Sequence, residues 1–237
     1  MRRALVTCLA AVLAVLAVGL LGLVGPAPAF AQTARLGGIA VHLRPGTSQV
    51  VTVDHTRGTS ARVSLWALKH GRWKRQLTTA GGRTGYGGLV AGAKRHQGTG
   101  ATPLGTYRLI SSFGTRPAKA SWDLPYRMIK KGDYWVEDNG SAYYNRYRNK
   151  AQGGFRWWLP LSARNGSERL SDYPKQYEEA IVLDYNQAQV RHRGAGIFLH
   201  VNGTGATAGC VSAPRWLLRK LLHRLDPARV PVIAIGR

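Results

Sequence analysis

A histidine and a cysteine in the last fifth of the chain are the residues best suited to covalent chemistry. His200 directly follows the apolar run 196–199, which is typical of a buried strand, and Cys210 follows it within a loop rich in glycine. A thiol becomes a strong nucleophile once it loses its proton, and a neighbouring imidazole can take that proton. The pattern fits a cysteine acyltransferase, and it equally fits a buried structural thiol beside a strand-end histidine.

The amino terminus is typical of an export signal. Arg2 and Arg3 precede the run 4–24, which is apolar or glycine except for Thr7, and residues 29–31 form a small-x-small cleavage site. We therefore expect a signal peptide over residues 1–31 and one exported domain over residues 32–237, secreted or held at the cell wall. Because the apolar run is long enough to cross a bilayer, an uncleaved N-terminal anchor stays open as the less favoured alternative.

Cysteine content and charge bound the class of protein. Cys8 lies inside the expected signal, so the exported domain holds Cys210 alone and no internal disulfide, which favours a reactive thiol. The formal net charge is +23, spread along the chain without a dense basic block. Since export argues against nucleic acid as a partner, the charge indicates either a solvated surface or salt-sensitive retention on anionic cell-envelope polymers.

Alternating apolar residues predict a mainly β fold. Apolar runs at helical spacing indicate one helix over residues 215–225, which Asp226 and Pro227 end, and the glycine-rich segment 81–88 is expected to be a loop. Because the sequence contains neither an internal repeat nor an interdomain linker, we expect one β-sandwich or barrel domain with one or two helices. Strands are expected at 49–53, 62–68, 73–77, 106–110, 180–185, 196–199 and 230–235.

Residues 120–160 are rich in aromatic side chains and have little periodicity. A long irregular insertion is often functional, so these aromatics are expected to form either core or a wall of a substrate groove. The histidines show no ligand spacing with carboxylates or cysteines, so neither a metal nor a cofactor is expected. Residues 98–100 do not form a dinucleotide loop, because Pro103 and a strand follow them instead of a helix.

Four segments occur in a characteristic order: 100–107 with Lys94 ahead of it, 182–186, 197–200 and the nucleophile segment 207–212. In this order the chain resembles the L,D-transpeptidase catalytic domain, the YkuD-like family of bacterial cell-wall enzymes. The resemblance covers roughly residues 80–237. It identifies the chain as a Thr-Ala-Gly-Cys variant, since Ala208 stands where most members have a second histidine and Ser212 stands where many have Asn or Arg.

The resemblance implies acyl transfer on peptidoglycan stem peptides in cell wall biogenesis, with effects on cell shape. Cys210 would attack a tetrapeptide at its bond to terminal D-alanine, with His200 as base and the carbonyl of Val201 holding the imidazole ring. An amine of a second stem would then take the acyl group. The N–H groups of Gly209 and Cys210 would stabilise the oxyanion, and Thr207 would position the loop. Carbapenems are implied as inhibitors, and a monomer is expected.

Other functions stay open at this point. Water as the acyl acceptor would make the protein an L,D-carboxypeptidase. Ala208, in place of the second histidine, favours a catalytically inactive, basic cell-wall-binding module. A papain-like endopeptidase fits less well, because in those families the cysteine precedes the histidine in the chain.

Overall fold

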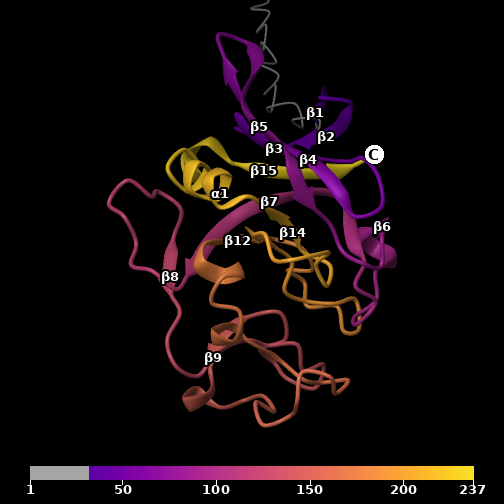
Figure 1. The fold of residues 1–237 in the computed structure, drawn as a ribbon, viewed down its shortest axis with the longest axis vertical. Coiled ribbons are helices and arrows are strands. Elements are labelled where there is room, and N and C mark those ends of the chain that lie inside the picture. Colours follow the sequence, from indigo (N-terminus) through magenta and orange to yellow (C-terminus); the bar gives the residue numbers. More distant parts are fainter. Residues whose placement is uncertain (1–31) are drawn as a thin grey trace, which may run out of the picture. The chain divides into compact units, whose positions relative to one another are not determined.

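Within residues 32–237, eight strands form the closed part of the main sheet (Figure 1). They are β3 (Gln49–His55), β4 (Ser60–Lys69), β5 (Arg72–Arg83), β7 (Thr102–Gly114), β12 (Ala180–Leu183), β13 (Phe198–Val201), β14 (Val211–Ala213) and β15 (Val232–Gly236). The protein is described here by a computed structural model over residues 32–237. The sheet order is β12-β13-β14-β5-β4-β3-β15-β7, and β12 also pairs with β7, so the sheet closes on itself like a barrel. The predicted mainly β fold is confirmed.

Shorter strands extend this sheet and flank it. The first hairpin consists of β1 (Gln32–Leu36) and β2 (Ile39–Leu43), which pair with each other. The edge strands β6 (Leu89–Ala91) and β8 (Tyr126–Met128) both pair with β7 in parallel. A separate small sheet has the order β10-β9-β11, made of β10 (Tyr147–Asn149), β9 (Asp133–Trp135) and β11 (Glu168–Arg169).

Helix α1 (Arg215–Leu222) buries one leucine face against the barrel, and its cations point outward. Leu217, Leu218, Leu221 and Leu222 are fully buried, and each contributes about 2 kcal/mol by leaving water. The predicted end at residue 225 is wrong, because His223 caps the helix and the next residues form a turn. Asp226 precedes Pro227 and is held in an extended conformation, so helical geometry cannot continue there.

The glycine-rich segment 81–88 is only partly the loop that the sequence predicts. Strand β5 continues to Arg83, so Gly81 and Gly82 lie within it. A Cβ at Gly82 would lie 2.6 Å from Val63 Cγ2 and 2.7 Å from the carbonyl oxygen of Ala61, next to a register shift between β4 and β5. Glycine is therefore needed at position 82 because the two strands approach closely there. The prediction of a loop rests on glycine content, which does not distinguish a turn from such a close contact between strands.

The aromatic insertion, residues 120–160, lies beside the barrel and contains strands β9 and β10 of the small sheet (Figure 1). Trp135 and Tyr144 are buried, and Trp135 packs on Phe113 and Phe198 of the barrel with ring centroids 6.4 and 4.8 Å apart. Four of the ten aromatics in residues 120–160 are buried core residues, whereas Tyr143, Trp157 and Trp158 are exposed. The insertion is held to the barrel by aromatic packing and forms part of the wall of the cavity described below.

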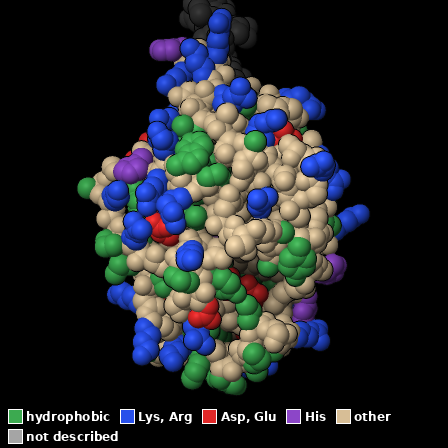
Figure 2. All heavy atoms as spheres, in the orientation of Figure 1, with side chains coloured by type: hydrophobic (Ala, Val, Ile, Leu, Met, Phe, Trp, Pro, Cys, Tyr) green, Lys and Arg blue, Asp and Glu red, His purple; other side chains and the backbone are tan. Residues whose placement is uncertain are grey.

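Basic side chains are distributed over the visible face of the molecule and acidic ones are few (Figure 2). Between residues 32 and 237 no helix is long and apolar enough to cross a membrane. The same range contains no cluster of His, Cys, Asp and Glu that could hold a metal ion. The expected signal peptide over 1–31, with its alternative role as an anchor, lies outside the described residues.

Replacing Gly85 by alanine is expected to destabilise the protein. The added Cβ would lie 2.0 Å from the carbonyl oxygen of Gly100 and 2.9 Å from Gly209 Cα, and neither backbone atom can move away cheaply. Overpacking of this kind costs about 3 kcal/mol, which corresponds to a melting temperature lower by roughly 6–12 °C. Gly205→Ala is the matched control, since its Cβ meets nothing within 4 Å. Equal melting temperatures for the two variants would show that the Gly85 contact is not restrictive.

Candidate active site

The two halves of the site are brought together by the parallel pairing of β13 and β14. In this register His200 lies opposite Ser212, and Cys210 directly precedes β14. Residues 202–210 connect the strands, and Asn202 ties the ends of this loop together. Its side chain accepts a hydrogen bond from Ser212 Oγ at 2.7 Å and donates to the carbonyl of Gly81 at 2.7 Å. The motif residues are thus held at one end of the barrel.

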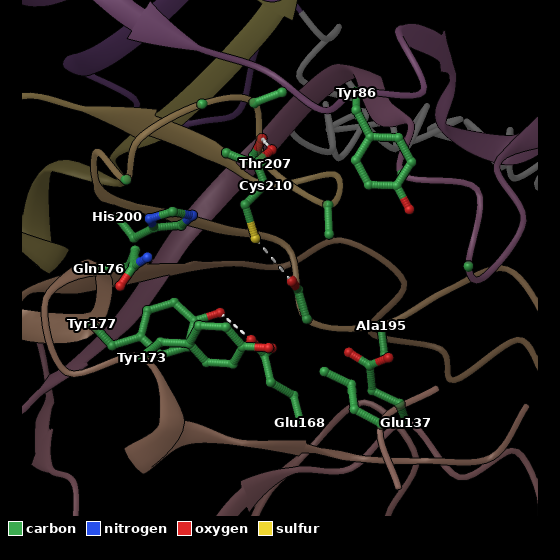
Figure 3. Close-up of a pocket in the computed structure, with 18 of the residues that line it drawn as sticks. Tyr86, Glu137, Glu168, Tyr173, Gln176, Tyr177, Ala195, His200, Thr207 and Cys210 are labelled. Carbon is green, nitrogen blue, oxygen red and sulfur yellow. Dashed lines mark hydrogen bonds between the residues drawn. The ribbon is translucent and has the colours of Figure 1, made fainter. Parts of the chain in front are cut away.

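Cys210 is 8% exposed, and its sulfur faces a cavity of about 530 Å³ (Figure 3). The thiol donates to the carbonyl of Gly196 at 3.3 Å and accepts from the N–H of Phe198 at 3.4 Å. Burial raises the pKa of the Cys210 thiol to about 12, and the nearby charge of Glu168 adds to the effect. At neutral pH the resting site therefore contains a thiol rather than a thiolate.

His200 lies beside this sulfur and is 7% exposed (Figure 3). Its Nδ1 lies 2.8 Å from the carbonyl oxygen of Val201, which can only accept, so Nδ1 carries the proton and Nε2 keeps a lone pair. Within residues 32–237 no hydrogen bond reaches Nε2. Burial lowers the pKa of His200 to about 4, so the ring is a neutral imidazole at rest. The ring of Tyr177 packs edge-on against it, with centroids 5.5 Å apart.

The resting pair is neutral, and the thiol proton points toward Gly196 instead of the imidazole. The thiol is nevertheless accessible, because Cys210 and His200 both line the cavity. A neutral thiol and a neutral imidazole at one cavity can exchange a proton when a bound molecule turns the thiol and stabilises the resulting charge. The arrangement therefore suits a nucleophile that is activated on ligand binding.

Thr207 shapes the loop around the cysteine. Its hydroxyl donates to the carbonyl of Cys210 at 2.6 Å and accepts from the N–H of Gly209 at 3.2 Å. The backbone of Thr207 also pairs with the segment after β5, through its N–H to Thr84 and its carbonyl to Tyr86. The Gly209 N–H, expected as an oxyanion donor, is thus engaged by Thr207 in this structure.

The basic residue at the site is Arg95, one position after the Lys94 that the sequence comparison singled out. Lys94 is exposed, whereas Arg95 is 5% exposed and lines the cavity. Arg95 Nε donates to the carbonyl of Ala101 at 2.7 Å, and the guanidinium lies against Gly209, where a Cβ would come within 2.7 Å of it. Gly209 also has a φ of +127°, which L side chains rarely adopt. Both the contact with Arg95 and the backbone conformation therefore require glycine at this position.

An acidic wall of the cavity escaped the sequence analysis. Glu137 and Glu168 line it together with Tyr173, Gln176 and Tyr177 (Figure 3). Burial raises the pKa of both carboxyl groups, and Glu168 accepts a hydrogen bond from the Tyr177 hydroxyl at 2.5 Å. The sequence offers one signal for these two glutamates, which is the rarity of acidic residues in the chain, 11 against 34 basic ones.

None of the aromatic residues between 120 and 160 lines this cavity, but Phe155, Trp157 and Trp158 line a second pocket, so the groove-wall hypothesis stays a prediction for them. The aromatic lining comes from Tyr86, Tyr173 and Tyr177, outside that stretch. The insertion contributes the polar side chain of Glu137 instead. Ala208, at the position where the family resemblance implies a second histidine, also lines the cavity. The wall opposite the cysteine is therefore polar and charged.

Comparison with known proteins identifies the family. The model of YkuD, the L,D-transpeptidase catalytic domain, matches residues 48–233, and the chain belongs to this family, whose members are cysteine L,D-transpeptidases. No curated protein gave a significant match. Among solved structures, Bd1075 of Bdellovibrio bacteriovorus is similar at 14% identity with a TM-score of 0.40. That match covers 80% of this chain and 48% of Bd1075, so the chain spans about half the length of that relative.

Thr207→Val tests whether the threonine hydroxyl holds the nucleophile loop. The substitution keeps the shape but leaves the Gly209 N–H without its acceptor, and only the longer bond from Thr102 at 3.3 Å remains on the Cys210 carbonyl. We expect a loss of about 1–3 kcal/mol in the free energy of unfolding, measured by denaturant titration. Thr204→Val in the same loop is the control, since Thr204 is exposed. Equal free energies of unfolding for Thr207→Val and Thr204→Val would contradict this role of the Thr207 hydroxyl.

The neutral resting pair predicts the pH dependence of alkylation at Cys210. With a pKa of about 12, roughly one thiol in ten thousand is ionised at pH 8, and the imidazole, with a pKa of about 4, stays neutral throughout. The iodoacetamide rate should therefore rise about tenfold per pH unit from pH 7.5 to 9.5 without a plateau. Peptide mapping separates Cys210 from Cys8. A plateau below pH 8 would instead reveal a thiolate–imidazolium pair at rest.

Proposed function

We propose that this protein is an exported peptidoglycan L,D-transpeptidase that uses Cys210 as nucleophile. The observation that carries the proposal is the placement of the Cys210 thiol and the His200 imidazole on one cavity within the matched catalytic domain. The donor is a stem tetrapeptide ending in D-alanine. The acceptor is an amine of a second stem, and the product is a wall crosslink.

In the first half-reaction, Nε2 of His200 takes the thiol proton as sulfur attacks the carbonyl carbon of the donor. The bond between that carbon and the D-alanine nitrogen breaks, and His200 returns the proton to the leaving amine. A thioester on Cys210 remains. The hydrogen bond from Nδ1 to Val201 at 2.8 Å fixes the ring orientation and stabilises the imidazolium that forms in passing.

The oxyanion that forms during the attack is stabilised by backbone N–H groups of the nucleophile loop. The Cys210 N–H is the proposed donor, and the Gly209 N–H joins it by leaving Thr207 Oγ1, to which it is bound at 3.2 Å in the resting loop. Loss of one such donor raises the barrier by about 3 kcal/mol in other enzymes. Thr207 thus acts as the resting partner of an amide that the transition state uses.

A second candidate activity differs only in the acceptor. If water attacks the thioester, the protein is an L,D-carboxypeptidase that trims stems without crosslinking them. A third candidate, an inactive basic wall-binding module, is favoured by Ala208 alone. An accessible thiol beside an imidazole with a free Nε2 favours activity over that module.

The proposed location is outside the cytoplasmic membrane, following export by the N-terminal signal. The net charge of +23 supports retention of the protein on anionic envelope polymers. The proposed partners are peptidoglycan stem peptides, with carbapenems as acylating inhibitors of Cys210. A monomer is sufficient for this chemistry, because the nucleophile and base come from the same chain.

Acylation of the wild-type protein by a carbapenem should add one inhibitor mass, and a disaccharide-tetrapeptide should release D-alanine. Cys210→Ala should abolish both, because the thiol is the acyl acceptor. His200→Ala should slow acylation by at least a hundredfold, while the exposed His192→Ala should stay within twofold. Intact mass and D-alanine assays give the readout. D-alanine release by Cys210→Ala would refute the nucleophile, and a folded wild type without adduct would support the binding module.

A further inference from the structure

Two carboxyl groups on the cavity wall, Glu137 and Glu168, lack an ion pair among residues 32–237, although Arg95 lines the same cavity and its charge acts on Glu137 from a distance. Glu178 and Glu179, next to the site, pair with arginines at 2.5–3.2 Å. In contrast, neither Glu137 nor Glu168 forms an ion pair within residues 32–237, although basic residues outnumber acidic ones 34 to 11. The lack of an ion pair at Glu137 and Glu168 is therefore not explained by a shortage of basic residues.

Their oxygens are also largely free of hydrogen bonds. Among the described residues only Oε1 of Glu168 accepts one, from the Tyr177 hydroxyl at 2.5 Å. This bond fixes the Glu168 carboxylate, and the backbone of Glu137 is fixed by hydrogen bonds to Ser167 at 3.0 Å and from Gln97 at 2.9 Å. Partly buried acceptors held in place beside a cavity are suited to binding a donor from a ligand.

The two glutamates also act on the chemistry next to them. Burial raises the pKa of Glu137 to about 8 and that of Glu168 to about 7, so the two groups are only partly ionised near neutral pH. In their ionised forms Glu168 and, more weakly, Glu137 raise the pKa of the Cys210 thiol and oppose formation of the thiolate, whereas Arg95 in the same cavity lowers that pKa. A cation bound between them would remove that opposition. Independently, His200 is 7% exposed and directs an Nε2 without a partner into the same cavity, which marks the cavity as a place that receives a ligand.

We propose that Glu137 and Glu168 form a subsite for the primary ammonium group of the acyl acceptor, carried on a short alkyl side chain. This inference rests on the proposed acyl transfer and specifies its acceptor. A metal ion is not the expected occupant, since no group of three or more ligating side chains surrounds any point among residues 32–237. An alkylammonium offers three N–H donors to the free oxygens and brings its nitrogen to the wall that faces the thioester.

The transfer step then balances as follows. The ammonium gives one proton to a carboxylate of the pair, and the freed lone pair attacks the thioester carbonyl carbon. The new carbon–nitrogen bond forms and the carbon–sulfur bond breaks. The second nitrogen proton passes through His200 to the departing sulfur, which restores the thiol. The carboxylate later releases its proton to solvent, so the products are the amide, free enzyme and one proton.

The test uses two matched probes, N-(5-aminopentyl)acetamide and its neutral analogue N-(5-hydroxypentyl)acetamide. The protein is acylated with a tetrapeptide whose own side-chain amine is acetylated, and the ratio of aminolysis to hydrolysis product is read by mass. We expect Glu137→Gln/Glu168→Gln to lower this ratio at least tenfold. The acylation rate should rise, because charges that oppose the thiolate are gone. Glu137→Asp/Glu168→Asp should restore part of the ratio.

Asp123→Asn is the matched control, since Asp123 is an exposed carboxylate without an ion-pair partner in the described range. It should keep the wild-type ratio. An unchanged ratio in the double glutamine variant, with acylation intact, would overturn the subsite while leaving the proposed function in place. Melting temperatures of all variants show whether they fold.

Direct binding separates the subsite from the proposed chemistry. In a titration of the unacylated protein followed by NMR, the amine probe should bind at least tenfold more tightly than the hydroxyl probe. The difference should vanish in Glu137→Gln/Glu168→Gln and persist in Asp123→Asn. If no acyl-enzyme forms but this preference holds, the acyl transfer fails and the ammonium subsite stands. Equal binding of the two probes by the wild type would overturn the subsite.

Discussion

The site depends on a parallel pair of strands joined by an unusually short connection. Parallel neighbours normally need a crossover of a dozen or more residues, often a helix, whereas β13 and β14 are joined by residues 202–210 alone. The loop can return in so few residues because the backbone of Thr207 pairs with the segment after β5, and Asn202 ties its two ends. This bracing holds Cys210, which directly precedes β14, at the start of the strand next to the one that contains His200.

The loop constrains the electrostatics as well as the geometry. Its return path buries the thiol and the imidazole together, and burial moves their pKa values in opposite directions, to about 12 and about 4. Both shifts favour the neutral forms, so charge separation between sulfur and imidazole needs help from a ligand. The fold thus keeps the thiol protonated at rest, which lowers its reactivity toward oxidants.

How far the sequence predicts this site depends on how local each signal is. The apolar run before His200 and the glycines before Cys210 are contiguous, so their strand and loop could be read directly. Arg95, Glu137 and Glu168 reach the cavity from segments without periodicity, so no pattern pointed to them. Gly82 was misread because glycine marks both turns and close strand contacts, and only the β4–β5 register separates the two. The predicted helix end at 225 failed through a cap at His223 that hydrophobic spacing does not encode.

A single turn connects the core to the acidic wall. In η4 (Gln176–Glu178), Glu178 binds Arg215 and Arg219 of α1, while the preceding Tyr177 packs on His200 and donates to Glu168. Neighbouring residues of one turn therefore point to opposite sides, one to the helix and one to the cavity. The leucine face of α1, buried in the barrel, fixes the helix, and the ion pairs of Glu178 transmit that position to Tyr177. The orientation of Glu168 thus depends on hydrophobic packing on the far side of the turn. A carboxylate oriented by the core costs little to hold in place when a cation arrives, which is what a preorganised binding group requires.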